Sequence, residues 1–581
     1  MKQSNAPLYK NRIKLLFGSA AVLALAGCAA RQDVAETQPA PSAPNQAQEA
    51  QAQTVGSAEE RDSTEQVIVT GSRLEPMKFA GKPASKLRAR QIHSLIDRPG
   101  FLPPSQPDRE NYAHVKKNPI SAVADDPIST FSVDVDTGSY SLVRDRLNQG
   151  ILPNPDAVRT EELINYFSYD YGQPTGHTPF SVTTDAMITP WNQNTYLLRI
   201  GLQGKKMLED KRPAANLVLL LDVSGSMAAP DKLPLLTRSL SFMAGQLRED
   251  DRVSIVVYAG AAGLVLDVTK GTETATIRNA LSGLGAGGST AGGAGIQLAY
   301  AKAKEAFIEG GINRVLLATD GDFNVGTTGV EELKKIVAAN RESGISLSTL
   351  GFGDGNFNDH LMEQVAGVGN GNYAYIDNFR EAKKVLGDQL SSTIYTIAKD
   401  VKIQVEFNPA VVAEYRLIGY ENRVLADEDF TNDKVDAGEI GAGHSVTALY
   451  EIALVGSDGV RLPARRYATG SKKQKGKKHE LGFVKLRYKA PDGDTSQQVS
   501  EVMAKNILTR HAAPVPGLRH AAAVAAYGQL LSGSKYMDGF SFGDLIRLVQ
   551  HGDGFSGQHH AEFLALLESA QALKEMQTSG R

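Results

Sequence analysis

The most constraining feature of the sequence is an apolar run that ends in a cluster of small polar residues. Residues 217–221 read Leu-Val-Leu-Leu-Leu, and residues 222–227 read Asp-Val-Ser-Gly-Ser-Met. A short, branched apolar run is typical of a parallel strand that helices bury on both faces. Asp222, Ser224 and Ser226 alternate, so an extended turn can direct all three side chains to one side. One carboxylate and two hydroxyls form an oxygen-only set, which suits Mg²⁺ or Mn²⁺ rather than Zn²⁺.

Two further segments place polar residues where strands of such a sheet would end. Thr290 lies in a glycine-rich loop, residues 287–296, that precedes a predicted helix. Asp320 follows a second apolar run in residues 314–321. Ligands of open α/β sheets bind beyond the carboxyl ends of the strands, so we expect these segments to meet there. The alternative interpretation is an ordinary Gly/Ser-rich strand–helix turn with an N-cap.

The order Asp-x-Ser-x-Ser, then Thr, then Thr-Asp-Gly resembles the von Willebrand factor type A domain over residues 214–398. The resemblance implies a doubly wound, mostly parallel, Rossmann-like sheet with a metal-ion-dependent adhesion site (MIDAS). It also implies a divalent cation, with Mg²⁺ as the first choice and Mn²⁺ or Ca²⁺ as alternatives. The implied metal-binding residues are Asp222, Ser224, Ser226, Thr290 and Asp320.

The first residues of the chain favour a secretory leader. A basic start is followed by an apolar run, residues 15–26, that is too short to span a bilayer as a stable helix. The run ends in Leu-Ala-Gly-Cys, which resembles the cleavage box of bacterial lipoproteins, and Cys28 is the one cysteine of the chain. The resemblance implies a signal peptide at residues 1–27 and lipidation of Cys28. A plain secreted protein with an incidental cysteine is the alternative.

These features predict a location as well as an anchor. Ala29, rather than Asp, follows the cysteine, which favours the outer membrane of a Gram-negative envelope with the protein facing the periplasm. A single cysteine also excludes an intrachain disulfide.

Residues 28–109 are predicted to form a flexible tether. Residues 29–64 are rich in Ala, Gln, Pro, Glu and Ser, and cannot bury enough apolar surface to fold. Residues 65–73, Glu-Gln-Val-Ile-Val-Thr-Gly-Ser-Arg, resemble a segment near the start of many TonB-dependent receptors. They are either a strand for a partner's sheet edge or a β-prone piece of linker.

Residues 110–213 and 399–581 are predicted to be α+β regions on either side of the central domain. The carboxyl-terminal region shows four antiparallel strand patterns and then helical patterns, the first at residues 500–511. Both regions resemble bacterial YfbK-like lipoproteins. The predicted fold class is therefore multi-domain α/β, with the central doubly wound sheet flanked by α+β amino- and carboxyl-terminal regions.

The carboxyl-terminal region contains a lysine cluster and a histidine cluster, and the sequence does not assign a role to either. Lysines at residues 472–478 fit a solvated hairpin tip or contact with an acidic surface. His551, His559 and His560 lack the spacing of a zinc site.

The overall charge is nearly balanced, with 62 Lys+Arg against 65 Asp+Glu, which argues against a nucleic-acid-binding protein. Three functions fit the predicted metal site. In an envelope-anchored binding module, as the resemblance implies, an acidic side chain of a protein partner would complete the coordination of the cation. In a structural envelope protein the metal would only stabilise the fold. In a hydrolase, Asp322 or Asp354 would act as general base beside metal-activated water.

The binding module is favoured over the enzyme. The sequence contains no Gly-x-Ser-x-Gly elbow, paired zinc histidines or phosphate-binding loop that would accompany a hydrolytic site.

Overall fold

The computed structural model describes residues 110–207, 211–290, 292–321, 323, 329–463, 477–491, 493–509, 517–551 and 558–579. The predicted leader, the lipidated Cys28, the tether, Asp322 and most of the lysine cluster lie outside these described residues. Within the described part of the chain, no helix is both long and apolar enough to cross a membrane.

The central region forms a six-stranded sheet in the order β10-β9-β8-β5-β6-β7. Every pair is parallel except the β6–β7 hairpin at one edge. All residues of β5 and β8 are buried, as their uninterrupted apolar runs predict. The strands are β5 (Ala215–Asp222), β6 (Arg252–Tyr258), β7 (Ala262–Lys270), β8 (Ile312–Thr319), β9 (Ser346–Gly351) and β10 (Tyr373–Tyr375).

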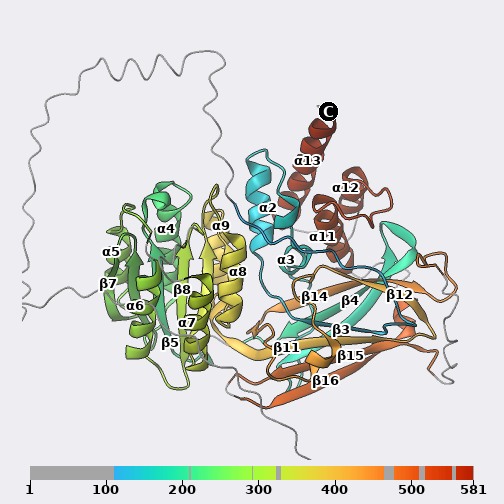
Figure 1. Cartoon of the computed structure of the whole chain (residues 1–581), viewed down its shortest axis with the longest axis horizontal. Coiled ribbons are helices and arrows are strands. Elements are labelled where there is room, and N and C mark those ends of the chain that lie inside the picture. The colour runs from blue at the N-terminus through green and yellow to red at the C-terminus, as the bar shows by residue number, and fades with distance from the viewer. Residues whose placement is uncertain are drawn as a thin grey trace, which may run out of the picture. The chain divides into compact units, whose positions relative to one another are not determined.

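Helices cover both faces of this sheet (Figure 1). Leu219 and Leu221 of β5 pack in one core with residues of α4 and α5, whereas Val218 and Leu220 pack in another with residues of α6, α7 and α8. Successive side chains of one strand thus pack into cores on opposite faces of the sheet, which confirms the doubly wound sheet. The helices are α4 (Leu233–Met243), α5 (Thr274–Ser282), α6 (Gly292–Glu305), α7 (Val330–Glu342), α8 (Asp359–Val368), α9 (Phe379–Lys383) and α10 (Leu390–Ile394).

The two flanking regions share their sheets. One sheet has the order β1-β12-β14-β4-β3, and the other has the order β13-β11-β15-β16 with β2 also paired to β11. From the region before the central domain come β1 (Ser121–Ala122), β2 (Ile128–Ser132), β3 (Phe180–Thr189) and β4 (Asn192–Gly204). From the region after it come β11 (Thr396–Phe407), β12 (Val412–Ile418), β13 (Ile440–Gly441), β14 (Ser445–Leu454), β15 (Glu480–Lys489) and β16 (Ser496–Ala504).

These sheets and a group of helices form three layers. One core lies between the two sheets and includes Leu198 of β4 and Val484 of β15. A second core lies between the first sheet and the helices, and includes Leu197 of β4 and Val524 of α11. Figure 1 shows α11 and α12 on the side of β14 and β12. The helices are α2 (Gly138–Asn148), α3 (Thr160–Asn165), α11 (Leu518–Leu531), α12 (Phe542–Gln550) and α13 (Gln558–Ser579).

One predicted helix is wrong. Residues 496–504 form strand β16, which pairs with β15 along its whole length, and only a short 3₁₀ turn, Lys505–Leu508, follows. Val499 and Met503 pack toward the core between the sheets. Residues four apart share one face in a helix and in a strand alike, so the apolar spacing does not distinguish the two. Pairing with β15 decides the outcome, because strand preference depends on tertiary context.

Candidate metal centre

Asp222 is the last residue of β5 and lies fully buried at the carboxyl end of the sheet. The Ser224 backbone N–H donates to its Oδ1 at 2.8 Å, and Thr319 Oγ1 donates to its Oδ2 at 2.9 Å. Burial raises the pKa of the Asp222 carboxyl, hydrogen bonds from Ser224 and Thr319 oppose that rise, and the charge of Asp320 adds to it. The carboxylate is therefore oriented from both sides in a place where a cation would stabilise its charged form.

The two serines lie on the turn that follows β5. Ser224 and Ser226 have their hydroxyl oxygens 3.0 Å apart, at the 3₁₀ turn Gly225–Ala228. Ser224 is buried and Ser226 is exposed. The predicted ligands thus lead from a buried carboxylate to a hydroxyl at the surface, and a bound cation would have one side open to solvent.

The glycine-rich loop before α6 is tied to this turn by two backbone hydrogen bonds. Gly287 N–H donates to Val223 O at 2.8 Å, and Gly225 N–H donates to Gly288 O at 3.0 Å. Gly288 has a φ of 84°, a left-handed conformation that a side chain would strain. The loop brings the half-buried Thr290 to the same edge of the sheet as Asp222.

The fifth predicted ligand, Asp320, directly follows β8 and is fully buried. Its Oδ2 accepts a hydrogen bond from Lys232 Nζ at 2.9 Å and from Asn356 Nδ2 at 3.3 Å. Lys232 also donates to Asn356 Oδ1 at 3.0 Å. Asp320 therefore already has a cationic partner from the chain itself.

Sequence reasoning missed Lys232. A lysine just before an amphipathic helix carries no motif, and only the fold shows that its side chain turns inward to 7% exposure. The position of the Lys232 side chain depends on Gly353. This glycine has a φ of 68°, and an added Cβ there would lie 2.4 Å from the Lys232 side chain. The loop after β9 thus makes room for the lysine.

Asp354, one of the two candidate general bases, lies on that same loop. Its Oδ2 is 3.4 Å from Arg146 Nη1 of α2, and the neighbouring Gly355 N–H donates to Glu110 Oε1 at 3.0 Å. The carboxylate is therefore held in an ion pair with the amino-terminal region.

The side chains of this site fit a hard divalent cation. They offer two carboxylates and three hydroxyls, with oxygen as the only donor atom. Asp222, Ser224 and Ser226 are brought together by the hydrogen bonds given above, and the loop of Thr290 and the end of β8 lie beside them. Their role as ligands stays a prediction.

No histidine cluster competes with this site within the described residues. There, the single group of three or more His, Cys, Asp or Glu side chains with closely spaced ligand atoms is Asp134, Glu162 and Glu363. This acidic group lies outside the predicted metal site.

Comparison with known proteins agrees with this architecture. Residues 216–388 match the von Willebrand factor type A domain, residues 106–199 match the family described as von Willebrand factor, and residues 392–573 match "Uncharacterized protein YfbK, C-terminal". The fold and the site together define a protein built on a von Willebrand factor type A domain. The chain is 44% identical over 481 residues to the uncharacterized protein YfbK of Escherichia coli K12, covering 81% of this chain and 83% of that protein. It therefore belongs to the YfbK family.

Solved structures share less with the chain. The von Willebrand factor type A protein from Catenulispora acidiphila is 14% identical, with a TM-score of 0.39 over 68% of this chain and 91% of that one. Proximal thread matrix protein 1 from the mussel byssus, solved with a zinc-occupied MIDAS motif, is 19% identical, with a TM-score of 0.26 over 30% of this chain and 45% of that one.

Proposed function

We propose that this protein is a cation-dependent binding module that holds a protein partner through an acidic side chain of that partner. The observation that carries the proposal is the pairing of Asp320 with Lys232 beside the oriented carboxylate of Asp222. Because Lys232 balances Asp320, the donor set presents a net charge close to that of Asp222 alone. A divalent cation held there keeps an excess positive charge, which attracts a carboxylate to its open side.

The same geometry favours this proposal over the other two functions. A metal with a purely structural role would be needed to balance buried charge, but the ammonium of Lys232 already does this for Asp320. A hydrolase would need a general base beside the ion. Asp354 is paired with Arg146, which does not favour that role.

Mg²⁺ is the cation we propose, since oxygen ligands and retained water match its preference, with Mn²⁺ or Ca²⁺ as alternatives.

The proposal extends to the location: the protein is anchored by a lipid on Cys28 in a Gram-negative envelope, in the outer membrane and facing the periplasm. Cys28→Ala would then release the protein from the membrane fraction or block its processing. Unchanged lipid labelling and fractionation of that variant would contradict the anchor.

The binding function is tested by capture from envelope extracts with the purified protein as bait. We expect a partner that is retained with Mg²⁺, lost with a chelator and lost with Asp222→Ala. Glu305→Gln, at an exposed position of α6, is the matched control and should retain the partner. Retention of the same partner by Asp222→Ala in the presence of chelator would overturn the proposal.

A further inference from the structure

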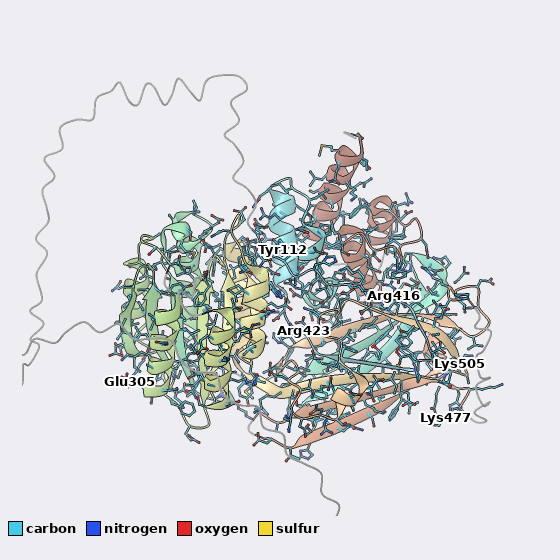
Figure 2. The ribbon with its side chains drawn as sticks, in the orientation of Figure 1. Tyr112, Glu305, Arg416, Arg423, Lys477 and Lys505 are labelled. Atoms are coloured by element: carbon cyan, nitrogen blue, oxygen red, sulfur yellow. The ribbon has the colours of Figure 1, made fainter. Side chains whose placement is uncertain are left out.

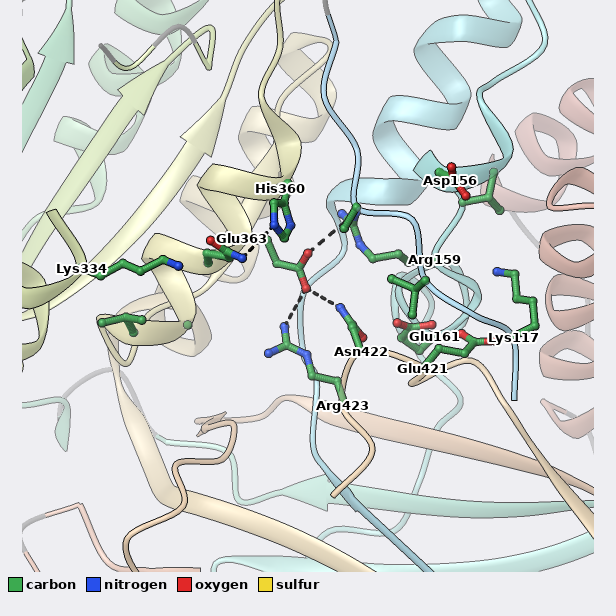
Figure 3. Close-up of a pocket in the computed structure, with 16 residues that line it drawn as sticks. Lys117, Asp156, Arg159, Glu161, Lys334, His360, Glu363, Glu421, Asn422 and Arg423 are labelled. Carbon is green, nitrogen blue, oxygen red and sulfur yellow. Dashed lines mark hydrogen bonds and ion pairs between the residues drawn. The ribbon is translucent and has the colours of Figure 1, made fainter. Parts of the chain in front are cut away.

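A cavity lined by charged and apolar side chains lies between α8, α3 and the loop that follows β12. It has a volume of about 430 Å³, within the range of small-molecule sites, and its lining includes Glu161, Glu363, Glu421 and Arg423. None of its lining residues belongs to the predicted metal centre. Figure 2 labels Arg423, which lies on the loop after β12, and Figure 3 shows the cavity itself.

Two arginines, the buried Arg159 and the half-buried Arg423, pair with most of the acidic side chains around this cavity. Arg159 pairs with Glu162 and with Asp359, the first residue of α8. Arg423 donates to Asp134 at 3.2 Å and to Glu363 at 3.3 Å. Figure 3 shows the Glu363 carboxylate between Arg159, Asn422 and Arg423. Each of these acids has an arginine partner within the chain, and together they form an internal network.

Glu161 stands apart from this network. Its side chain is 1% exposed, yet no hydrogen-bond partner is found for Oε2, and no ion pair joins it to a cation among the described residues. Burial raises the pKa of Glu161 to about 7, and the charges of Glu421 and Asp134 add to the rise, while the backbone N–H groups of Glu161 and Tyr420 lower it. A buried carboxylate without a counter-charge costs several kcal/mol, so the position favours a cation from outside the chain.

Glu421 supplies a second carboxylate at the same end of the cavity. It lies beside Glu161 in Figure 3, and its charge acts on that residue. The lining also contains two lysines, Lys117 and Lys334, and apolar side chains, among them Val115, Val158 and Val368. Two carboxylates beside apolar side chains match an ammonium group on an alkyl body. The cavity is far larger than a bare metal ion requires.

We propose that this cavity binds a small organic amine or an exposed lysine side chain, whose ammonium group is held by Glu161 and Glu421. The three N–H donors of an ammonium satisfy both carboxylates by charge-assisted hydrogen bonds. The alkyl body lies against the valine side chains. The site is independent of the metal centre and does not rest on the function proposed above.

Calorimetric titration of the purified full-length protein tests this site. The probes are n-butylammonium, Nα-acetyl-lysine and, as the uncharged analogue, n-butanol. We expect both amines to bind and n-butanol not to bind. Glu421→Gln should weaken amine binding roughly 10- to 100-fold, the range for loss of one hydrogen bond to a charged group, and Glu161→Gln should abolish it. Glu428→Gln, at an exposed position of the turn Asp427–Phe430, is the matched control and should bind normally.

The experiment distinguishes an amine site from two alternatives, which are binding at the metal centre and a Glu161 carboxyl that stays protonated without any ligand. Asp222→Ala should leave amine binding unchanged, so its loss in that variant would overturn an independent site. If Glu161→Gln does not fold, Glu421→Gln, whose side chain is only half-buried, decides the question. Absence of amine binding, together with a higher melting temperature of Glu161→Gln than of the wild type, would show that Glu161 is protonated in the folded protein and needs no cation. Binding of Ca²⁺ with this mutational pattern, and of no amine, would equally overturn the proposal.

Discussion

Lys232 Nζ lies 2.9 Å from Asp320 Oδ2, and the structure buries both side chains beside the predicted metal centre. A buried ion pair of this kind is costly to break, because either partner alone leaves an uncompensated charge. The lysine thus serves two purposes: it stabilises the domain in the absence of metal, and it limits the negative charge offered to a cation.

Lys232→Met tests this dual role. In metal-free solution the variant should lose about 3–5 kcal/mol in free energy of unfolding, because Asp320 lacks its ammonium partner. Mg²⁺ should bind the variant more tightly than the wild type and restore part of the loss by linkage. Chemical unfolding with and without Mg²⁺, combined with calorimetry, measures both effects.

The matched control for that change is Lys302→Met, which removes a lysine paired with the exposed side chains of Asp267 and Glu305. Its effect on the free energy of unfolding should be much smaller than that of Lys232→Met, because water screens exposed ion pairs. Equal Mg²⁺ affinity in wild type and Lys232→Met would show that Asp320 does not act on the cation.

The predicted ligands differ in what they contribute. Asp222→Ala should abolish Mg²⁺ binding, since it removes the carboxylate that two hydrogen bonds orient. Ser224→Ala and Thr290→Ala each remove one neutral oxygen and should weaken Mg²⁺ binding while the domain stays folded. Calorimetric titration with Mg²⁺, Mn²⁺, Ca²⁺ and Zn²⁺ should also rank Zn²⁺ below the oxygen-preferring ions. Wild-type Mg²⁺ affinity in Asp222→Ala would show that the site is misassigned.

Two glycines on the loop after β9 offer a test with a built-in control. Gly353 and Gly355 both have positive φ, but only at Gly353 would a Cβ meet another side chain, at 2.4 Å from Lys232. Gly355→Ala should therefore cost only the backbone strain, about 1–2 kcal/mol. Gly353→Ala should cost more, because it also displaces the lysine from Asp320. Equal melting temperatures of the two variants would contradict the packing described here.

The sequence predicts the central sheet well, because the sheet depends on local signals. The proposed metal-site residues rest on an equally local motif, and their role as ligands stays a prediction. Each of these signals can be recognised from a few consecutive residues. They are the buried apolar runs of β5 and β8 and the Asp-x-Ser-x-Ser turn. Lys232 and Glu161 carry no such signal, since their environments are created by loops more than a hundred residues away in the chain. The shared sheets of the flanking regions are equally non-local, as the pairing of β4 with β14 shows.

The buried acids around Arg159 and Arg423 predict a pH dependence of stability. Burial raises the pKa of Glu162 to about 8, although the charge of Arg159 lowers it, and the pKa of Glu161 is raised to about 7. In both cases the folded state holds its proton at a higher pH than the unfolded chain does. This contribution to stability is complete below about pH 4.5 and is lost as the pH rises through the folded-state pKa values.

Buried histidines act in the opposite direction at lower pH. Burial lowers the pKa of His444 and of His520 to about 4, so these groups favour the folded state increasingly as the pH rises toward their ordinary value of 6.5. Buried Lys384, whose pKa burial lowers to about 8, acts only above that pH. The acids therefore dominate between about pH 6.5 and pH 8.

In that window the free energy of unfolding should fall as the pH rises, by up to about 1.4 kcal/mol per pH unit for each group that titrates. Denaturant unfolding at several pH values between these limits measures the slope. Glu162→Gln should make the slope shallower, because the amide carries no titrating proton. Glu161, and Glu439, whose pKa burial raises to about 8, still contribute to it. The exposed Glu428→Gln should leave the slope as in the wild type. A stability that rises with pH across this window in the wild type would show that Glu162 and Glu161 are already ionised in the folded protein.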